Sequence, residues 1–161
     1  MESVKESILF KLERMGKLLG YLTEREWSPT SLKGKSRQNV YIPKIDLIWY
    51  KPVPQSFKEF IEKFKWQGTL DPYRDYEKEI IIGFELELTD RPTKYILGDI
   101  SNLSRLCNYG FIVIKNIENL VNRSVKASKA FSVLHGASNV FIIDINQIDD
   151  LLKWAQTLCK S

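Results

Sequence analysis

The sequence has few of the residues on which several common kinds of site depend. Its 161 residues include one histidine and two cysteines, Cys107 and Cys159. A disulfide framework, a Cys/His zinc cluster and a Ser-His-Asp hydrolase are therefore not favoured. No apolar run approaches the ~18–20 residues of a membrane span. The first residues include acids and no uninterrupted apolar segment, so we expect no secretory signal and a cytoplasmic location.

The rest of the composition is that of an ordinary folded domain. Hydrophobic residues make up 43% of the chain and charged residues 27%, which is close to the globular average. The length favours a single domain over residues 1–161, with enough surface to bury a core. The net charge of +4 permits nucleic-acid binding but does not establish it.

Apolar periodicity predicts helices alternating with strands. We expect helices over 3–19, 57–66, 92–107, 116–134 and from 146 onward, and strands over 20–27, 39–51, 79–89, 111–115 and 139–145. Ser56 with Glu59 is a capping-box pattern for the second helix, and Asn146 is expected to cap the last one. This order predicts an α/β fold, a central mixed sheet flanked by helices. Three tryptophans, Trp49, Trp66 and Trp154, are expected in the core.

Two acids share one face of the predicted strand over 79–89. Side chains alternate across a strand, so Glu85 and Glu87 point the same way, roughly 6.5–7 Å apart, opposite the face of Ile80 and Phe84. Like charges at this spacing repel one another unless a cation or water lies between them. The other possibility is that both glutamates line a solvent face.

A third acid interrupts the other strongly apolar strand. Asp46 lies between Ile45 and Leu47, where an ionised carboxylate is costly unless it is paired or bound to metal. If the two strands are neighbours, Asp46 can meet Glu85 and Glu87, with Lys44 beside it. Three such oxygen donors form the environment that Mg²⁺ prefers, and a metal there can activate water. The other possibility is a simple pair between Asp46 and Lys44.

At these residues the sequence resembles the PD-(D/E)XK superfamily of restriction-endonuclease-like nucleases. The matching pieces are an N-terminal helix, the strand PKIDLIWYK with Asp46, and the strand FELELT with Glu85 and Glu87, within about residues 1–115. The resemblance implies an αβββαβ core, a phosphodiester substrate and dependence on Mg²⁺ or Mn²⁺. It assigns metal binding to Asp46 and Glu85.

The sequence departs from the family pattern at one position of the site. Glu87 stands where the family usually has lysine, so it would act as a base or as a ligand to a second metal. Lys44 or Lys94 would then supply the positive charge. The family often adds an acid from its first helix, for which Glu6 and Glu13 are both candidates.

Basic residues lie close to these strands. Lys33, Lys35 and Arg37 occupy a segment without acids just before the Asp46 strand, and with Lys94 they are candidates for contacts to DNA phosphates. We therefore expect a metal-dependent DNA endonuclease, acting as a homodimer because enzymes that cut both strands commonly work as symmetric pairs. The alternative is a catalytically inactive nucleic-acid-binding module, or an interaction subunit, on the same fold.

Overall fold

Strands and helices follow one another in the predicted order. The computed structural model describes residues 3–32, 41–64, 71–115 and 120–159. The strands are β1 (Leu22–Trp27), β2 (Ile45–Pro52), β3 (Lys78–Glu87), β4 (Tyr109–Ile114) and β5 (Val140–Asp144). The helices are α1 (Val4–Leu18), α2 (Gln55–Phe64), α3 (Thr93–Leu106), α4 (Leu120–His135) and α5 (Ile148–Leu158), and short 3-10 turns lie over Thr30–Leu32 and Ile145–Gln147.

The five strands form one mixed sheet in the order β1-β2-β3-β4-β5. The pairs β1–β2 and β2–β3 are antiparallel, whereas β3–β4 and β4–β5 are parallel. The α/β class with a central mixed sheet is thereby confirmed. The parallel pairs are connected by α3 and α4, as crossover connections require.

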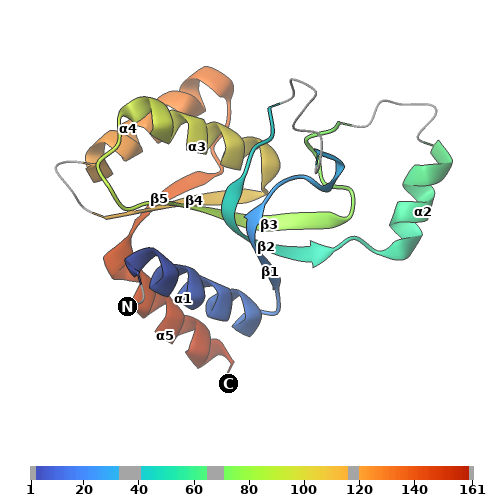
Figure 1. Cartoon of the computed structure of the whole chain (residues 1–161), viewed down its shortest axis with the longest axis horizontal. Coiled ribbons are helices and arrows are strands. Elements are labelled where there is room, and N and C mark those ends of the chain that lie inside the picture. Colours follow the sequence, from blue (N-terminus) through green and yellow to red (C-terminus); the bar gives the residue numbers. More distant parts are fainter. Residues whose placement is uncertain (1–2, 33–40, 65–70, 116–119, 160–161) are drawn as a thin grey trace.

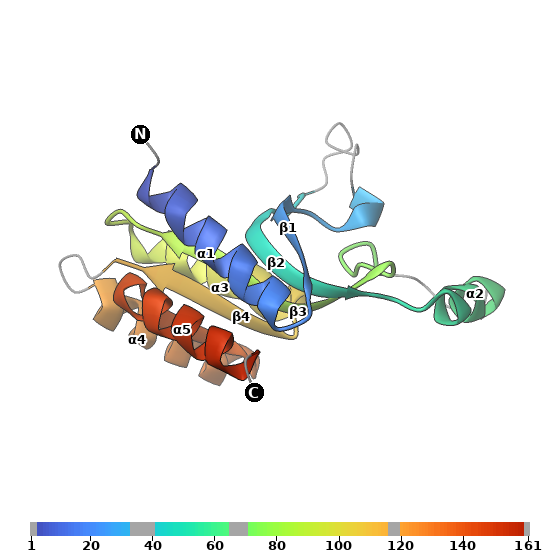
Figure 2. The ribbon, with the colours of Figure 1, turned by 90° about the horizontal axis from the view of Figure 1, so that it is seen from below.

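Helices cover both faces of the sheet. Figures 1 and 2 show α3 and α4 on one face and α1 and α5 on the other. Each face has its own buried apolar cluster: Ile48, Ile100 and Ile112 belong to the α3/α4 side, and Leu47 and Phe84 to the α1/α5 side. α2 projects away from this body (Figure 2). Among the described residues, no helix combines the length and apolarity needed to span a bilayer.

Several local predictions were wrong at the ends of elements. β2 begins at Ile45, and residues 41–44 precede it without strand pairing, while 39–40 lie outside the described residues. α2 begins at Gln55, so Ser56 lies inside the helix and not at its cap. The last helix follows a turn capped by Asp144, whose side chain accepts from the backbone N–H of Asn146. The prediction that Asn146 caps the last helix was wrong, because Asn146 lies inside the turn that Asp144 caps, and Gln147, which precedes α5, makes no side-chain capping bond.

The alternation along β3 is interrupted once. The register between β2 and β3 shifts between Trp49 and Tyr50, so Ile82 faces Trp49 and Ile80 faces Tyr50. Ile80 therefore packs on the α3/α4 side, whereas Phe84 packs on the α1/α5 side. The prediction that Ile80 shares a face with Phe84 was wrong because such a shift reverses the faces of a strand.

The tryptophans divide between core and surface. Trp27 and Trp49 are buried, and Trp49 Nε1 donates to the carbonyl oxygen of Leu12 at 3.0 Å, which ties α1 to β2. Trp154 on α5 is 52% exposed, so its prediction as a core residue was wrong. Trp66 lies outside the described residues.

Two glycines bring α3 close to the sheet. A Cβ on Gly83 would lie 2.5 Å from Cys107 Sγ, and a Cβ on Gly110 would lie 2.5 Å from Leu103 Cβ. Real side chains do not approach so closely, so only glycine at these positions of β3 and β4 allows the C-terminal half of α3 to pack at this depth.

Candidate functional site

The three predicted acids lie at one end of the sheet. Because β2 and β3 are antiparallel, with Leu47 opposite Phe84, the start of β2 lies beside the end of β3. Asp46 is the second residue of β2, and Glu85 and Glu87 are among the last three of β3. The antiparallel pairing thus brings together residues that are about forty positions apart in the sequence.

Glu85 and Glu87 point into the protein. They pair in register with Ile112 and Ile114 of β4, two fully buried residues of the α3/α4 cluster. Their exposed fractions are 7% and 6%. The possibility that these glutamates line a solvent face was therefore wrong, and both carboxyl groups lie between β3 and α3.

Asp46 joins this end of the sheet through the backbone of β3. Its Oδ2 accepts a hydrogen bond at 2.9 Å from the N–H of Leu86, the residue between Glu85 and Glu87. This bond holds the Asp46 carboxylate next to the backbone of β3. Its Oδ1 lies 3.5 Å from Lys5 Nζ of α1. The side chain is 22% exposed, so Asp46 forms the accessible rim of the acidic group.

A fourth acid, Asp99 of α3, completes the group, which we call the carboxyl cluster: Asp46, Glu85, Glu87 and Asp99. Its Oδ2 is buried and has no hydrogen-bond partner among the described residues. Sequence reasoning did not identify Asp99. The available signal was its place on the apolar stripe of α3, three residues after Ile96 and four before Leu103, both fully buried.

The cluster perturbs its own acids. The pKa of Glu85 is raised from 4.5 to about 10, mainly by burial and then by the neighbouring carboxyl groups of Asp46 and Asp99. Burial also raises the pKa of Asp99 to about 9, with further contributions from Glu87 and Asp46. The surrounding carboxyl groups therefore disfavour the ionisation of Glu85 and Asp99.

Two basic groups border the cluster. Arg91 Nε lies 3.2 Å from Glu87 Oε2, and its guanidinium opposes the rise in the pKa of Asp99. Lys5 reaches Asp46 from the opposite layer. Both cations are about half exposed, so they offset the buried negative charge only in part. Sequence reasoning had identified neither of them.

The other predicted partners of the cluster lie elsewhere. Lys44 was expected beside Asp46, but its Nζ forms a 3.9 Å ion pair with Glu26, because Lys44 precedes β2 and does not share its alternation. The two acids of α1 both bind Arg25 of β1: Glu6 at 2.5 Å from Nη1, and Glu13 at 2.9 Å from Nε. Arg25 therefore holds both first-helix candidates away from the carboxyl cluster.

Of the four predicted DNA contacts, only Lys94 lies within the described residues. Lys33, Lys35 and Arg37 lie outside the described residues. Lys94 is exposed in the first turn of α3, with its Nζ 5.3 Å from the centre of the Tyr95 ring, and Arg91 lies against the same ring. Lys94 is therefore available on the surface at the end of α3 that carries the cluster.

The donor set suits a hard cation, although the present side-chain positions do not enclose one. Among the described residues, no group of three or more Asp, Glu, His or Cys side chains is arranged to hold a metal ion directly. Mg²⁺ commonly binds through one or two carboxylates and keeps several waters, so three direct protein ligands are not required. The unpartnered Oδ2 of Asp99 and the mutually repelling carboxyl groups fit such a cation in chemistry.

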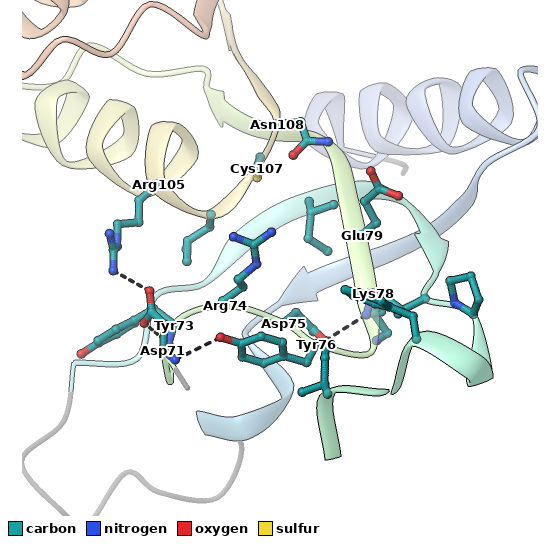
Figure 3. Close-up of a pocket in the computed structure, with 16 residues that line it drawn as sticks. Asp71, Tyr73, Arg74, Asp75, Tyr76, Lys78, Glu79, Arg105, Cys107 and Asn108 are labelled. Atoms are coloured by element: carbon teal, nitrogen blue, oxygen red, sulfur yellow. Dashed lines mark hydrogen bonds and ion pairs between the residues drawn. The ribbon is translucent and has the colours of Figure 1, made fainter. Parts of the chain in front are cut away.

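A separate cavity lies at the opposite end of β3. It has a volume of about 730 Å³ and is lined by the start of β3, the end of α3, α2 and residues 71–76 (Figure 3). Two ion pairs involve its lining: Arg105 binds Asp71 at 2.6 Å, and Lys78 binds Glu24 at 2.9 Å. No carboxyl-cluster residue lines it, so the two sites are distinct.

Comparison with known proteins gave no match among family models, curated proteins or solved structures.

Proposed function

We propose that the chain is a metal-dependent DNA endonuclease in which the carboxyl cluster binds Mg²⁺ or Mn²⁺. The observation that carries this proposal is the convergence of four carboxyl groups from β2, β3 and α3 in a largely buried place. Buried carboxylates without matching counter-charges are costly, so their collection at one point favours a cation-binding role. Apart from α2, which is inserted between β2 and β3, the elements from α1 to β4 follow the order αβββαβ with β4 parallel to β3, and this order supports the proposal.

Each residue has a role that follows from its position. Asp46 and Glu85 are the proposed metal ligands, with Asp99 or Glu87 as further ligands. A bound divalent ion would supply a water of lowered pKa and would stabilise negative charge on a phosphate. Lys5 and Arg91 hold Asp46 and Glu87 in place through the ion pairs described above. Lys94 is a proposed contact to the DNA backbone beside the site.

One observation favours the alternative, a nucleic-acid-binding module without cleavage. Glu87 occupies the position at which the resemblance implies lysine, and its carboxylate is paired with Arg91. With such an ion pair in place of a metal, the protein would bind DNA through surrounding basic residues, with a strong dependence on salt and none on divalent cations.

The test compares cleavage of plasmid, duplex and branched DNA by the wild type and two variants, with Mg²⁺, Mn²⁺ or EDTA. Asp46→Asn should abolish cleavage. Glu79→Gln is the matched control, because Glu79 is an exposed acid of the same strand at the opposite end. Equal cleavage by the wild type and Asp46→Asn would contradict the proposal. DNA binding unaffected by EDTA, with no cleavage under either metal, would establish the alternative.

A further inference from the structure

The two edges of the sheet differ in their chemistry. At the β1 edge, Glu24, Arg25 and Glu26 are consecutive charged residues, and Glu26 has a left-handed backbone with φ of 48°. Charge and irregular backbone protect an edge strand from pairing with another chain. β5, with the sequence VFIID, has no proline and no charge before Asp144. Among the described residues, no strand pairs with the outer edge of β5.

The helix beside this edge carries an exposed apolar stripe. Leu151, Trp154 and Leu158 of α5 recur at spacings of three and four, and they are 36%, 52% and 48% exposed. The side of α5 that faces α1 is marked by two other residues. Asp149 binds Lys11 of α1, and Cys159 Sγ donates to a carbonyl oxygen at the end of α1. Helical spacing places the stripe on the side of α5 that faces away from α1.

Phe141 extends the apolar surface from α5 to the strand edge. Its ring lies 5.4 Å from that of Phe111, which packs in the cluster beneath α1 and α5. Phe141 therefore lies on the same face of the sheet as α5, and it is 46% exposed. Strand edge, Phe141 and the α5 stripe together form what we call the β5/α5 surface.

The size of this surface suits an interface. Large apolar side chains expose about 150–250 Å² when free, so the four exposed residues of the β5/α5 surface contribute roughly 350 Å² of apolar area. A stable protein interface buries about 800 Å² per partner, with an apolar centre and a polar rim. The four side chains are enough for such a centre, and the backbone of β5 and neighbouring polar residues would supply the remainder.

We propose that the β5/α5 surface binds a second copy of the same chain, with the two β5 strands paired antiparallel about a two-fold axis at Ile142. In this register, Phe141 of one copy lies opposite Ile143 of the other, on the face covered by α5. Val140 lies opposite Asp144, so no like charges meet. The unpaired N–H and C=O groups of each β5 edge satisfy those of the other. This self-complementarity favours a second copy over an unrelated partner, and it does not depend on the proposed nuclease function.

The first test is the oligomeric state of the full chain. Sedimentation at up to about 100 µM, where a complex with a micromolar Kd is largely associated, should show a dimer. Trp154→Glu and Phe141→Glu should each produce a folded monomer, with folding checked by circular dichroism. Phe10→Glu is the matched control: Phe10 is 59% exposed but shares the side of α1 that binds Arg25 of β1. A monomeric wild type, or a dimer unaffected by both β5/α5 variants, would overturn the proposal.

A second test fixes the register and does not depend on destabilising variants. Directly opposed residues of antiparallel strands have Cα atoms about 4.5–5.5 Å apart, which lies within the range of about 4.4–6.8 Å for a disulfide. Ile142→Cys in a Cys159→Ser background should therefore form a covalent dimer on mild oxidation. Phe10→Cys in the same background should not. Equal crosslinking at both positions, or none at position 142, would contradict the proposed two-fold pairing.

Discussion

Asp75 and Glu85 are both buried acids, but they have very different neighbours. Asp75 accepts hydrogen bonds from Trp27 Nε1, from the hydroxyl of Thr30 and from the backbone N–H groups of Glu77 and Lys78, at 2.9–3.2 Å. The pKa of Glu85, in contrast, is raised first by burial and then by other carboxyl groups. The hydrogen bonds of the fold satisfy Asp75, whereas Glu85 is surrounded by other carboxyl groups.

This difference separates a structural acid from a candidate binding acid. A buried carboxylate that accepts several donors is stabilised without any ligand, because its hydrogen bonds replace those it made to water. A buried carboxyl group among other carboxyl groups gains most from a cation that neutralises them together. Burial alone would have placed the two acids in the same class, and the donors around each carboxyl group distinguish them.

The largest expected effect concerns catalysis. Glu85→Gln should lower the rate of Mg²⁺-dependent DNA cleavage by on the order of 1,000-fold, because a charged ligand of the metal is removed without a change in shape. Asp75→Asn should retain the wild-type rate per folded molecule. The measurement is a single-turnover cleavage rate, corrected for the folded fraction. Similar losses in both variants would remove the distinction between the two acids.

The effects on the free energy of unfolding should be the reverse of those on cleavage, with the larger loss at Asp75. Asp75→Ala should lower the free energy of unfolding by about 3 kcal/mol, since it leaves several donors, including the buried Trp27 N–H, without an acceptor. Glu85→Gln should not destabilise the metal-free protein near neutral pH, since the raised pKa keeps the Glu85 carboxyl group protonated and a neutral amide of the same shape replaces it. Urea denaturation monitored by tryptophan fluorescence measures both values. A neutral result for Asp75→Ala would show that its hydrogen bonds contribute little.

The pH dependence of metal-free stability is a smaller effect with a defined sign. The pKa of Glu85 is raised from 4.5 to about 10 in the folded protein, so the folded state holds its proton where the unfolded state has lost it. This contribution is complete below pH 4.5 and is lost as the pH rises toward 10. Glu85→Gln should therefore flatten the decline between these values. Thermal unfolding in EDTA across this range measures it, and an unchanged slope would contradict the assignment.

The smallest expected effect concerns Arg91. Its side chain is 51% exposed, so its ion pair with Glu87 should contribute less than about 1 kcal/mol to stability. Arg91→Gln should nevertheless strengthen the dependence on metal, because it removes a positive charge next to the carboxyl cluster. The increase in Tm on addition of Mn²⁺, compared with that of the wild type, tests this. A smaller increase in the variant would show that Arg91 does not compete with the cation.

The sequence allowed the sheet end of the site to be predicted, but not its helical side. Alternation placed Glu85 and Glu87 on one face, and antiparallel neighbours bring Asp46 beside them, because strand geometry is regular over these residues. Asp99 was missed because periodicity describes a helix face without saying which strand residues that face meets. Its position between buried residues of α3 was nevertheless a usable signal.

The mistaken assignments have local causes. Lys44 was placed by extending alternation beyond the true start of β2 at Ile45. Glu6 and Glu13 were chosen by analogy from the first helix, but Arg25 on the neighbouring strand binds both. For the two glutamates a long-range ion pair decided the outcome, and single-sequence patterns contain no information about such pairs.

Gly83 and Gly110 determine how deep the carboxyl cluster lies. Since α3 is one continuous helix, the spacing at its C-terminal half also sets the height of Asp99 above β3. The absence of a side chain at these two positions thus sets the distance between Asp99 on α3 and the acids on β2 and β3. A single added carbon at either position would tilt the helix and open the ligand set, leaving every chemical group of the site unaltered.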